Sequence, residues 1–357
     1  MTYVHWANGP HWSCKIITMI NLQDNVFNVR QAPSAAKLKL WRYAGLMLTY
    51  RCNAACRFCY YFCGPQAGGL MPVETALEAW AGLRRLAGDE AKVHLTGGEP
   101  FLVFDRLLEI CEQAQRRGWG GADYAETNAG WVTDEAEARY RLNALKAAGL
   151  HRLKISWDVF HEEFVPAEKV RFLVRAAREL LGDERVLVRW EKHLDARSGM
   201  AAMAEAERQA LLAGAMGADA GRFTGRAAET LGPLCADQTI AELEGLTCRE
   251  AFLGAKGVHI DPAGNVFSGQ CSGMTVGNIT ASPLDQLWKG FDPERAAFWR
   301  TLFERGPGGF LAEAQAAGYA VRPFYATKCH LCSDIRGFFF DKGLYLPIIC
   351  PKECYGK

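Results

Sequence analysis

Residues 51–64 read RCNAACRFCYYFCG, and this stretch shapes what we expect of the rest of the chain. Cys52, Cys56 and Cys59 have the spacing C-x3-C-x2-C, and Cys63 follows four residues later. Three thiolates on one short loop can ligate three irons of a cubane cluster, which leaves the fourth iron open to another molecule. A structural zinc site needs four protein ligands, commonly from two separate cysteine pairs. The spacing therefore favours a 4Fe–4S cluster, with a zinc knuckle or a group of buried thiols as the alternative.

The same loop resembles the signature of the radical S-adenosylmethionine (radical SAM) enzymes, in which an aromatic residue precedes the third cysteine, as Phe58 does here. The resemblance implies that Cys52, Cys56 and Cys59 are the catalytic ligands of the 4Fe–4S cluster. It also implies that the open iron takes the amino and carboxylate groups of S-adenosyl-L-methionine (SAM). Phe58 and Tyr60 are then expected beside this cofactor.

The composition narrows the class of protein. Basic and acidic residues are nearly equal in number, 41 against 40, which argues against nonspecific nucleic-acid binding and against a polybasic membrane patch. The sequence has no run of about eighteen apolar residues that could span a membrane, and its N-terminus lacks an apolar signal core. We therefore expect a cytoplasmic protein. In that compartment 13 cysteines favour metal clusters over disulfides.

From residue 45 the chain alternates short apolar stretches with amphipathic ones, which predicts strand–helix units. Such repeats imply parallel strands joined by right-handed crossovers. Six units predict an α/β fold with a partial (β/α)6 TIM-like barrel, and the radical SAM resemblance implies the same fold. Strands are expected at 45–49, 91–96, 122–127, 152–158, 186–190 and near 221–224.

A chain of 357 residues exceeds the size at which single cores tend to split. We expect an N-terminal extension over residues 1–40, the barrel over 41–230 and a smaller C-terminal α+β iron–sulfur domain over 231–357. Residues 225–227, Gly-Arg-Ala, resemble a stretch that follows the sixth strand in family members with such a C-terminal domain. In barrels of this kind active residues lie at the C-terminal ends of the strands.

A glycine pair follows the second expected strand, in the sequence Thr96-Gly97-Gly98-Glu99-Pro100. Gly97 and Gly98 allow a close approach of the backbone to a ligand. Glu99 can accept a hydrogen bond from an ammonium group. The radical SAM resemblance implies that this motif binds the amino group of the SAM methionine.

Polar residues also end the third and fourth expected strands. Asn128 belongs to Thr-Asn-Ala-Gly, which resembles the family's Thr-Asn-Gly turn except that Ala129 interrupts it. Cofactor contact by Asn128 and a plain turn both remain open. Ser156 and Asp158 can hydrogen-bond ribose hydroxyls, and the resemblance supports that role.

Arg189 is a charged residue within the apolar fifth strand. A buried arginine needs a partner. The resemblance implies the cofactor carboxylate, while an internal salt bridge with Glu126 or Glu191 is the alternative. His161 and Glu162 follow the fourth strand and could touch substrate, although a surface loop is the favoured interpretation.

A second group of cysteines lies in the C-terminal part. Cys248 and Cys271 flank residues 257–267, which read as two strands joined by a Pro/Gly/Asn turn. Cys329 and Cys332 form a C-x2-C pair. The arrangement resembles the SPASM and Twitch domains of radical SAM enzymes, which implies at least one auxiliary 4Fe–4S cluster on these four residues. A zinc ribbon is the alternative.

The longer SPASM pattern differs from this sequence near its end. Cys350 and Cys354 come late, so a second auxiliary cluster that uses them with Cys235 is left open. The sequence assigns no role to Cys14, Cys63 or Cys111.

The resemblance implies an oxidoreductase that cleaves SAM to a 5′-deoxyadenosyl radical and removes hydrogen from an unactivated C–H bond. We expect modification of a ribosomally made peptide, and alternatively oxidation or dehydrogenation of a small-molecule biosynthetic intermediate. A non-catalytic iron–sulfur electron carrier or scaffold is a third candidate, but it has no need of the glycine pair. Expected partners are an electron donor such as a flavodoxin or ferredoxin, and a separate leader-binding protein, because only some forty residues precede the barrel.

Overall fold

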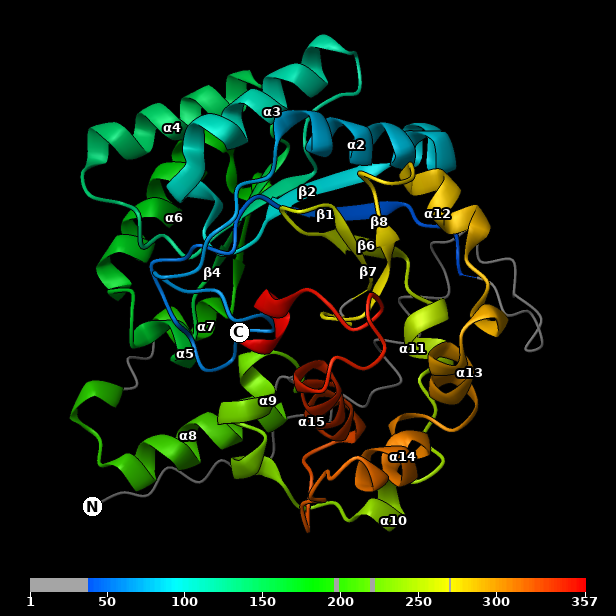
Figure 1. Ribbon diagram of the computed structural model, residues 1–357. Coiled ribbons are helices and arrows are strands. Elements are labelled where there is room, and N and C mark those ends of the chain that lie inside the picture. Colours follow the sequence, from blue (N-terminus) through cyan, green and yellow to red (C-terminus); the bar gives the residue numbers. More distant parts are fainter. Residues whose placement is uncertain (1–37, 196–198, 219–221, 270) are drawn as a thin grey trace. The chain divides into compact units, whose positions relative to one another are not determined.

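One sheet with the strand order β5-β4-β3-β2-β1-β6-β7-β8 organises the protein (Figure 1). The computed structural model describes residues 38–357 except 196–198, 219–221 and 270. The strands from β5 to β6 in this order are parallel, and β7 and β8 continue the sheet antiparallel. The strands are β1 (Tyr43–Met47), β2 (Lys92–Thr96), β3 (Tyr124–Thr127), β4 (Arg152–Ser156), β5 (Val186–Arg189), β6 (Gly257–Ile260), β7 (Asn265–Ser268) and β8 (Thr275–Asn278).

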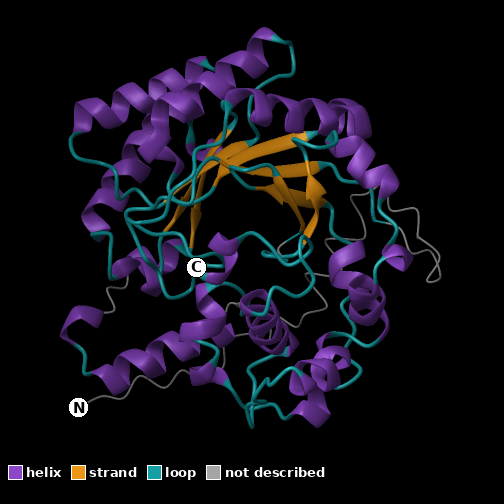
Figure 2. Ribbon diagram, viewed as in Figure 1, coloured by secondary structure: helices purple, strands orange, loops and turns teal. Residues whose placement is uncertain are grey.

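Long helices follow β1 to β4 in turn and lie on the outer face of the curved sheet (Figure 2). They are α2 (Val73–Ala87), α3 (Phe104–Arg116), α4 (Glu135–Ala147) and α6 (Ala167–Leu181). Each buries an apolar stripe against the strands, and one leucine from each helix, Leu83, Leu107, Leu142 and Leu173, is fully buried. This regular succession of strands and helices confirms the expected α/β fold with a parallel sheet.

The sixth parallel strand does not come from the expected segment. Residue 221 lies outside the described residues, and residues 222–224 form no strand. Instead β6 pairs in parallel with β1, in the register Tyr43 with Gly257. The segment expected as a strand leads into α9 (Arg226–Thr230), which is hydrogen-bonded to the cysteine loop: the amide of Arg226 donates to the carbonyl of Tyr61 at 3.3 Å. The placement of the sixth strand near 221–224 was therefore wrong.

The other helices come before β6 or after β8, and most of them lie on the open side of the sheet (Figure 1). Those before β6 are α5 (Val159–Glu162), α7 (Glu191–Asp195), α8 (Glu205–Ala218), α9, α10 (Ile240–Leu243) and α11 (Arg249–Leu253). Those after β8 are α12 (Leu284–Gly290), α13 (Ala297–Glu304), α14 (Leu311–Ala316) and α15 (Lys328–Asp341). Residues 38–357 form one compact unit, and its sheet continues across residue 230. The division into a barrel and a C-terminal domain stays a prediction, and the expected extension, with Cys14, lies largely outside the described residues.

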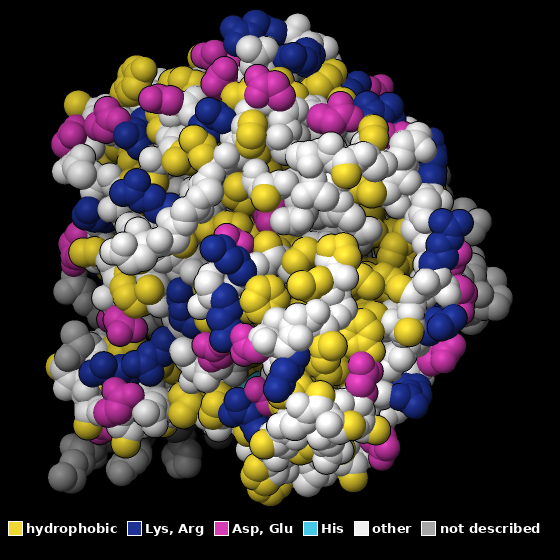
Figure 3. All heavy atoms as spheres, viewed as in Figure 1, with side chains coloured by type: hydrophobic (Ala, Val, Ile, Leu, Met, Phe, Trp, Pro, Cys, Tyr) yellow, Lys and Arg dark blue, Asp and Glu magenta, His cyan; other side chains and the backbone are white. Residues whose placement is uncertain are grey.

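The surface agrees with the balanced charge of the chain. Figure 3 shows basic and acidic side chains interspersed over the visible face. Among the helices described, none combines the length and the apolar character that crossing a membrane requires.

Candidate active site

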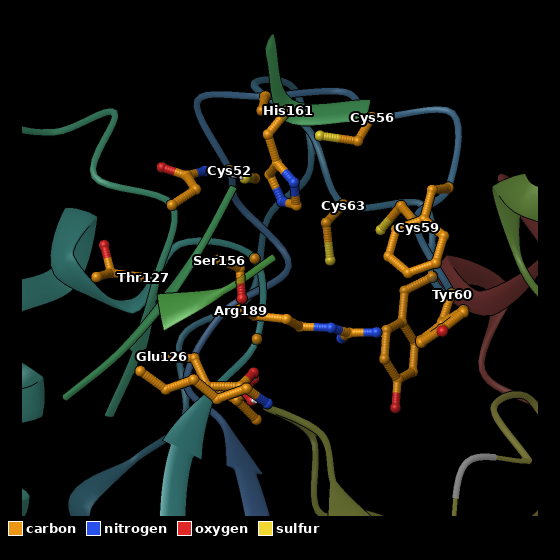
Figure 4. Close-up of a pocket in the computed structure, with 18 of the residues that line it drawn as sticks. Cys52, Cys56, Cys59, Tyr60, Cys63, Glu126, Thr127, Ser156, His161 and Arg189 are labelled. Carbon is orange, nitrogen blue, oxygen red and sulfur yellow. Dashed lines mark hydrogen bonds and ion pairs between the residues drawn. The ribbon is translucent and has the colours of Figure 1, made fainter. Parts of the chain in front are cut away.

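The cysteine loop connects β1 to α2 and is closed at its base by backbone hydrogen bonds. The amide of Cys52 donates to the carbonyl of Gly64 at 3.0 Å, and the amide of Gly64 donates to the carbonyl of Tyr50 at 3.3 Å. Within the loop the amide of Cys59 donates to the carbonyl of Cys56 at 3.1 Å. These bonds fold the loop so that its cysteines line one pocket (Figure 4).

The fourth cysteine of this stretch, Cys63, lines the same pocket although the sequence assigned it no role. Its thiol forms a hydrogen bond with Cys59, and this bond is the main reason why the pKa of the Cys59 thiol is lowered, to about 6. Burial raises the pKa of the Cys52 thiol to about 12. The Cys63 thiol thus favours the deprotonated form of Cys59.

Arg226, the first residue of α9, stabilises the cysteine loop. Its guanidinium donates to the carbonyl of Cys56 at 3.1 Å and to the carbonyl of Cys63 at 2.8 Å. The hydroxyl of Thr230 donates to the carbonyl of Arg57 at 2.9 Å. Sequence reasoning noted the Gly-Arg-Ala stretch by its resemblance alone, and the contacts now show what its arginine does.

The glycine pair after β2 packs against the backbone that leads into the cysteine loop. The amide of Gly98 donates to the carbonyl of Thr49 at 2.7 Å. A Cβ on Gly98 would lie 2.1 Å from the carbonyl oxygen of Arg51, and Gly97 has a φ of 131°. No other residue type fits at these two positions without moving the loop. Both glycines also line the pocket.

Glu99 is fully buried and is not among the residues that line the pocket. Its carboxylate accepts from the amide of Phe101 at 3.1 Å and from the amide of Asn128 at 2.7 Å. Burial raises its pKa to about 7. The carboxylate thus links the turn after β2 to the turn after β3, and its contact with the SAM amino group stays a prediction.

The turn after β3 brings Asn128 to the cysteine loop. Its side-chain amide donates to the sulfur of Cys52 at 3.5 Å and to the side-chain oxygen of Asn53 at 3.1 Å. Asn128 lines the pocket, as expected of a cofactor-binding residue.

The sequence placed Asp158 at the cofactor and His161 in a surface loop, and the structure has the reverse arrangement. Asp158 is 5% exposed, does not line the pocket, and receives hydrogen bonds from the amides of Phe160 and His161. His161 lines the pocket, and its Nδ1 lies 2.6 Å from Asp158 Oδ1. Burial disfavours a charged imidazole, but the Asp158 carboxylate outweighs it and raises the pKa of His161. The surface-loop interpretation of His161 was therefore wrong.

Ser156 and Arg189, at the ends of β4 and β5, line the pocket as expected. The guanidinium of Arg189 lies 3.6 Å from the ring centroid of Trp190 and 5.8 Å from that of Phe58. Neither carboxylate proposed as its internal partner pairs with it, because Glu126 pairs with Lys154 and Glu191 with Arg178, each at 2.7 Å. Among the described residues Arg189 forms no ion pair, so its charge is available to an anion in the pocket.

Sequence reasoning missed a polar group on the inner face of the sheet, which we call the inner polar group: Thr96, Glu126, Lys154 and His259. Thr96 donates to Glu126 at 2.6 Å. Burial disfavours the charged form of Glu126 and by itself would raise its pKa. The charge of Lys154 outweighs burial, so that the pKa of Glu126 is lowered to about 2. The imidazole of His259 donates from Nδ1 to the carbonyl of Gly269 at 2.8 Å. Polar residues at alternate positions of otherwise apolar strands were the available signal.

The C-terminal part brings together the four cysteines expected to bind an auxiliary cluster. Cys248 precedes α11, Cys271 follows β7, and Cys329 and Cys332 lie in the first turns of α15. Burial raises the pKa of Cys271 to about 12, and the charges of Cys329 and Cys332 add to the effect. The pKa of Cys248 is raised by burial first and then by the other three cysteines. Their electrostatic influence on one another indicates that the four thiols are neighbours.

The remaining cysteines have other surroundings. The thiol of Cys235 contacts the carbonyl of Ala213 at 3.9 Å, and that of Cys350 donates to the carbonyl of Pro347 at 2.8 Å. Cys354 is buried, with its sulfur 3.9 Å from the hydroxyl of Tyr50. Cys235 thus packs against α8, and a second auxiliary cluster that uses Cys235, Cys350 and Cys354 stays a prediction. Cys111 is a fully buried core residue of α3.

Neither group of cysteines is arranged for a single ion. In the described ranges, no three histidine, cysteine or acidic side chains lie closely enough to ligate one metal ion. In a cubane cluster each cysteine binds a different iron, whereas a zinc site gathers all its ligands around one centre. The iron–sulfur cluster on the C-terminal cysteines stays a prediction, with zinc as its alternative.

The fold and the pocket together define an α/β partial barrel with a three-cysteine loop after its first strand. Residues 46–181 match the family model of the Radical SAM superfamily. This part of the chain is therefore a radical SAM domain, as the sequence predicted.

Two curated relatives have the same name, GTP 3′,8-cyclase. The GTP 3′,8-cyclase of Paenarthrobacter nicotinovorans is 32% identical over 122 residues, which cover 33% of this chain and 32% of that protein. The mitochondrial GTP 3′,8-cyclase of Arabidopsis thaliana is 33% identical over 143 residues, 38% of this chain and 32% of that protein. The chain thus matches about a third of the length of each relative.

Solved structures with some likeness were also found. The complex of BtrN with AdoMet and 2-DOIA has a TM-score of 0.43 and 16% identity, covering 76% of this chain and 90% of that one. Native anSMEcpe with AdoMet and the Cp18Cys peptide has a TM-score of 0.39 and 12% identity, covering 84% and 97%.

Proposed function

We propose that the protein is a radical SAM enzyme that abstracts hydrogen from an unactivated C–H bond of its substrate. The observation that carries this proposal is that Cys52, Cys56 and Cys59 line one pocket with Gly97, Ser156 and Arg189. When bound, the cluster and SAM together supply a 5′-deoxyadenosyl radical as the hydrogen acceptor. The protein's part is to bind, orient and exclude water.

Each lining residue has a defined task in this proposal. Arg189 offers a cation without a described acidic partner, which suits the carboxylate of SAM. Ser156 offers a hydroxyl to the ribose. Phe58 supports the pocket wall because its ring stacks on Phe160 with centroids 4.9 Å apart. His161, fixed by Asp158, takes the place toward the cofactor or the substrate that the sequence gave to Asp158.

The C-terminal cysteines would hold one auxiliary 4Fe–4S cluster on Cys248, Cys271, Cys329 and Cys332. Four thiolates saturate a cubane, so this cluster would exchange electrons and would not bind SAM. The auxiliary cluster would accept the electron of the substrate radical, so the overall reaction would be an oxidation, and a donor such as a flavodoxin or ferredoxin would supply the electron that cleaves SAM.

Two substrate classes follow from different observations. A ribosomally made peptide, presented with a separate leader-binding protein, is the class that the resemblance to SPASM and Twitch enzymes suggests. The inner polar group favours a second candidate, a small polar biosynthetic intermediate that is oxidised or dehydrogenated. Its ion pair of Glu126 with Lys154 and the imidazole of His259 line the pocket, where they can hydrogen-bond a polar ligand.

One assay tests the proposed activity. The full chain is reconstituted anaerobically with iron and sulfide, reduced, and given SAM, and 5′-deoxyadenosine is measured. We expect formation by the wild type and its loss when Cys52, Cys56 and Cys59 are all replaced by alanine. Formation at the wild-type rate by the triple variant would refute the assignment.

A further inference from the structure

Asn128 carries a contact that neither the resemblance nor the pocket lining explains. Its side-chain amide donates a hydrogen bond to the sulfur of Cys52 at 3.5 Å, and a second one to Asn53 at 3.1 Å. Both ends of the first bond are shielded from water, because Asn128 is 6% and Cys52 7% exposed. A buried amide beside a thiolate is a stronger electrostatic partner than the same pair in water.

The surroundings fix the orientation of this amide. The side-chain oxygen of Asn128 accepts from the amide of Gly130 at 2.7 Å, so the NH2 group must face the loop. A Cβ on Gly130 would lie 1.9 Å from the Asn53 side-chain nitrogen, which shows how closely the turn packs on the loop. Ala129 has a φ of 65°, a left-handed conformation that residues other than glycine rarely adopt. Such a conformation persists only where neighbouring contacts hold it.

We propose that Asn128 sets the reduction potential of the radical SAM cluster through its hydrogen bond to Cys52. The inference rests on the proposed function, because it requires a cluster on this loop. Reduction places additional negative charge on the cluster and its ligating sulfurs. An N–H donor aimed at one of those sulfurs stabilises the reduced state more than the oxidised state and raises the potential. Asn128 is thus a positioning residue toward Cys52, whose effect does not depend on contact with SAM.

The experiment measures the midpoint potential of the SAM-free cluster in the reconstituted full chain. The signal of the radical SAM cluster is identified in the EPR spectrum as the one that changes when SAM is added. Two variants remove the donor: Asn128→Asp keeps an acceptor for the Gly130 amide, and Asn128→Leu keeps the side-chain size. We expect both to shift the midpoint to a more negative potential. The matched control is Asn53→Ala, which removes the neighbouring amide and leaves the bond to Cys52, and its shift should be smaller.

A second measurement detects the nitrogen of Asn128 at the cluster directly. Wild-type protein made with 15N-labelled asparagine should show hyperfine coupling of side-chain nitrogen to the reduced cluster in pulsed EPR. Asn53→Ala should retain this coupling and Asn128→Leu should lose it. Unchanged SAM-free potentials in both Asn128 variants, or absence of the coupling in the wild type, would overturn the inference. A wild type without any SAM-responsive signal would instead refute the proposed function.

Discussion

Glu99 shows that a residue recognised from its motif can also have a structural role in the folded protein. The motif predicted an acceptor for an ammonium group, and the fold uses both carboxylate oxygens for backbone amides of two different turns. A carboxylate that accepts hydrogen bonds from the protein's own backbone still shapes the site, because it fixes Asn128, which lines the pocket. Removing both oxygens would leave two buried amides without partners.

The pH dependence of stability provides a test of this burial. The pKa of Glu99 is raised from 4.5 to about 7, so the folded state holds the proton more tightly than the unfolded chain does. The free energy of unfolding therefore falls as pH rises from about 4.5 to 7, because the folded state must bury the charge it acquires. Glu99→Gln should weaken this fall. Chemical denaturation of the cluster-free chain at several pH values measures it, with the exposed Glu74→Gln as control. Identical pH profiles for the wild type and Glu99→Gln would contradict the assignment.

Residue identity and spacing predicted the loop, the glycine pair and Ser156 from short motifs, and Arg189 as a charge within an apolar strand. They did not predict the inner polar group. Glu126 and Lys154 are close only because β3 and β4 pair in parallel, and no spacing within the chain encodes that pairing. His161 was judged a surface residue for a similar reason, since its burial depends on Asp158 turning back onto α5.

At the scale of elements, the helices that follow β1 to β4 were predictable from local periodicity and the position of β6 was not. The apolar stripes of α2, α3, α4 and α6 repeat within the helix itself. The pairing of β6 with β1 joins distant parts of the chain, so an earlier apolar segment was assigned in its place. Residues 222–224 of that earlier segment form no strand and lead into α9.

The contact between α9 and the cysteine loop gives a prediction at this scale. Arg226→Met would remove both hydrogen bonds to the loop carbonyls of Cys56 and Cys63 while keeping much of the side-chain volume. Hydrogen bonds from a charged group contribute about 1.5–3 kcal/mol each, so the loop should be less ordered. We expect less iron bound per chain after reconstitution and faster loss of iron to a chelator. Arg116→Met, at an exposed arginine of α3, is the control. Equal iron retention in the two variants would show that Arg226 does not hold the loop.

The whole molecule joins two groups of cysteines through one continuous sheet. The loop after β1 carries the first group, and β6 and β7, which extend the sheet from β1, lead to Cys271 of the second. The other three cysteines of the second group belong to helices on the open side of the sheet. Cys248 lies at the start of α11, and Cys329 and Cys332 lie in α15. An auxiliary cluster here would be held by the same folded unit as the radical SAM pocket, so the two would keep a fixed separation.

The second group should bind its cluster without the first. In the variant with Cys52, Cys56 and Cys59 replaced by alanine, four thiolates remain on Cys248, Cys271, Cys329 and Cys332, enough to saturate a cubane. We expect about four irons per chain after anaerobic reconstitution, and an EPR spectrum of the reduced protein that does not change when SAM is added. The control adds Cys271→Ala to the triple variant and should lose this iron. Zinc without sulfide in the triple variant would identify a structural zinc module, because only a multi-iron cluster needs bridging sulfide. An electron-transfer role for this part of the molecule would then be excluded.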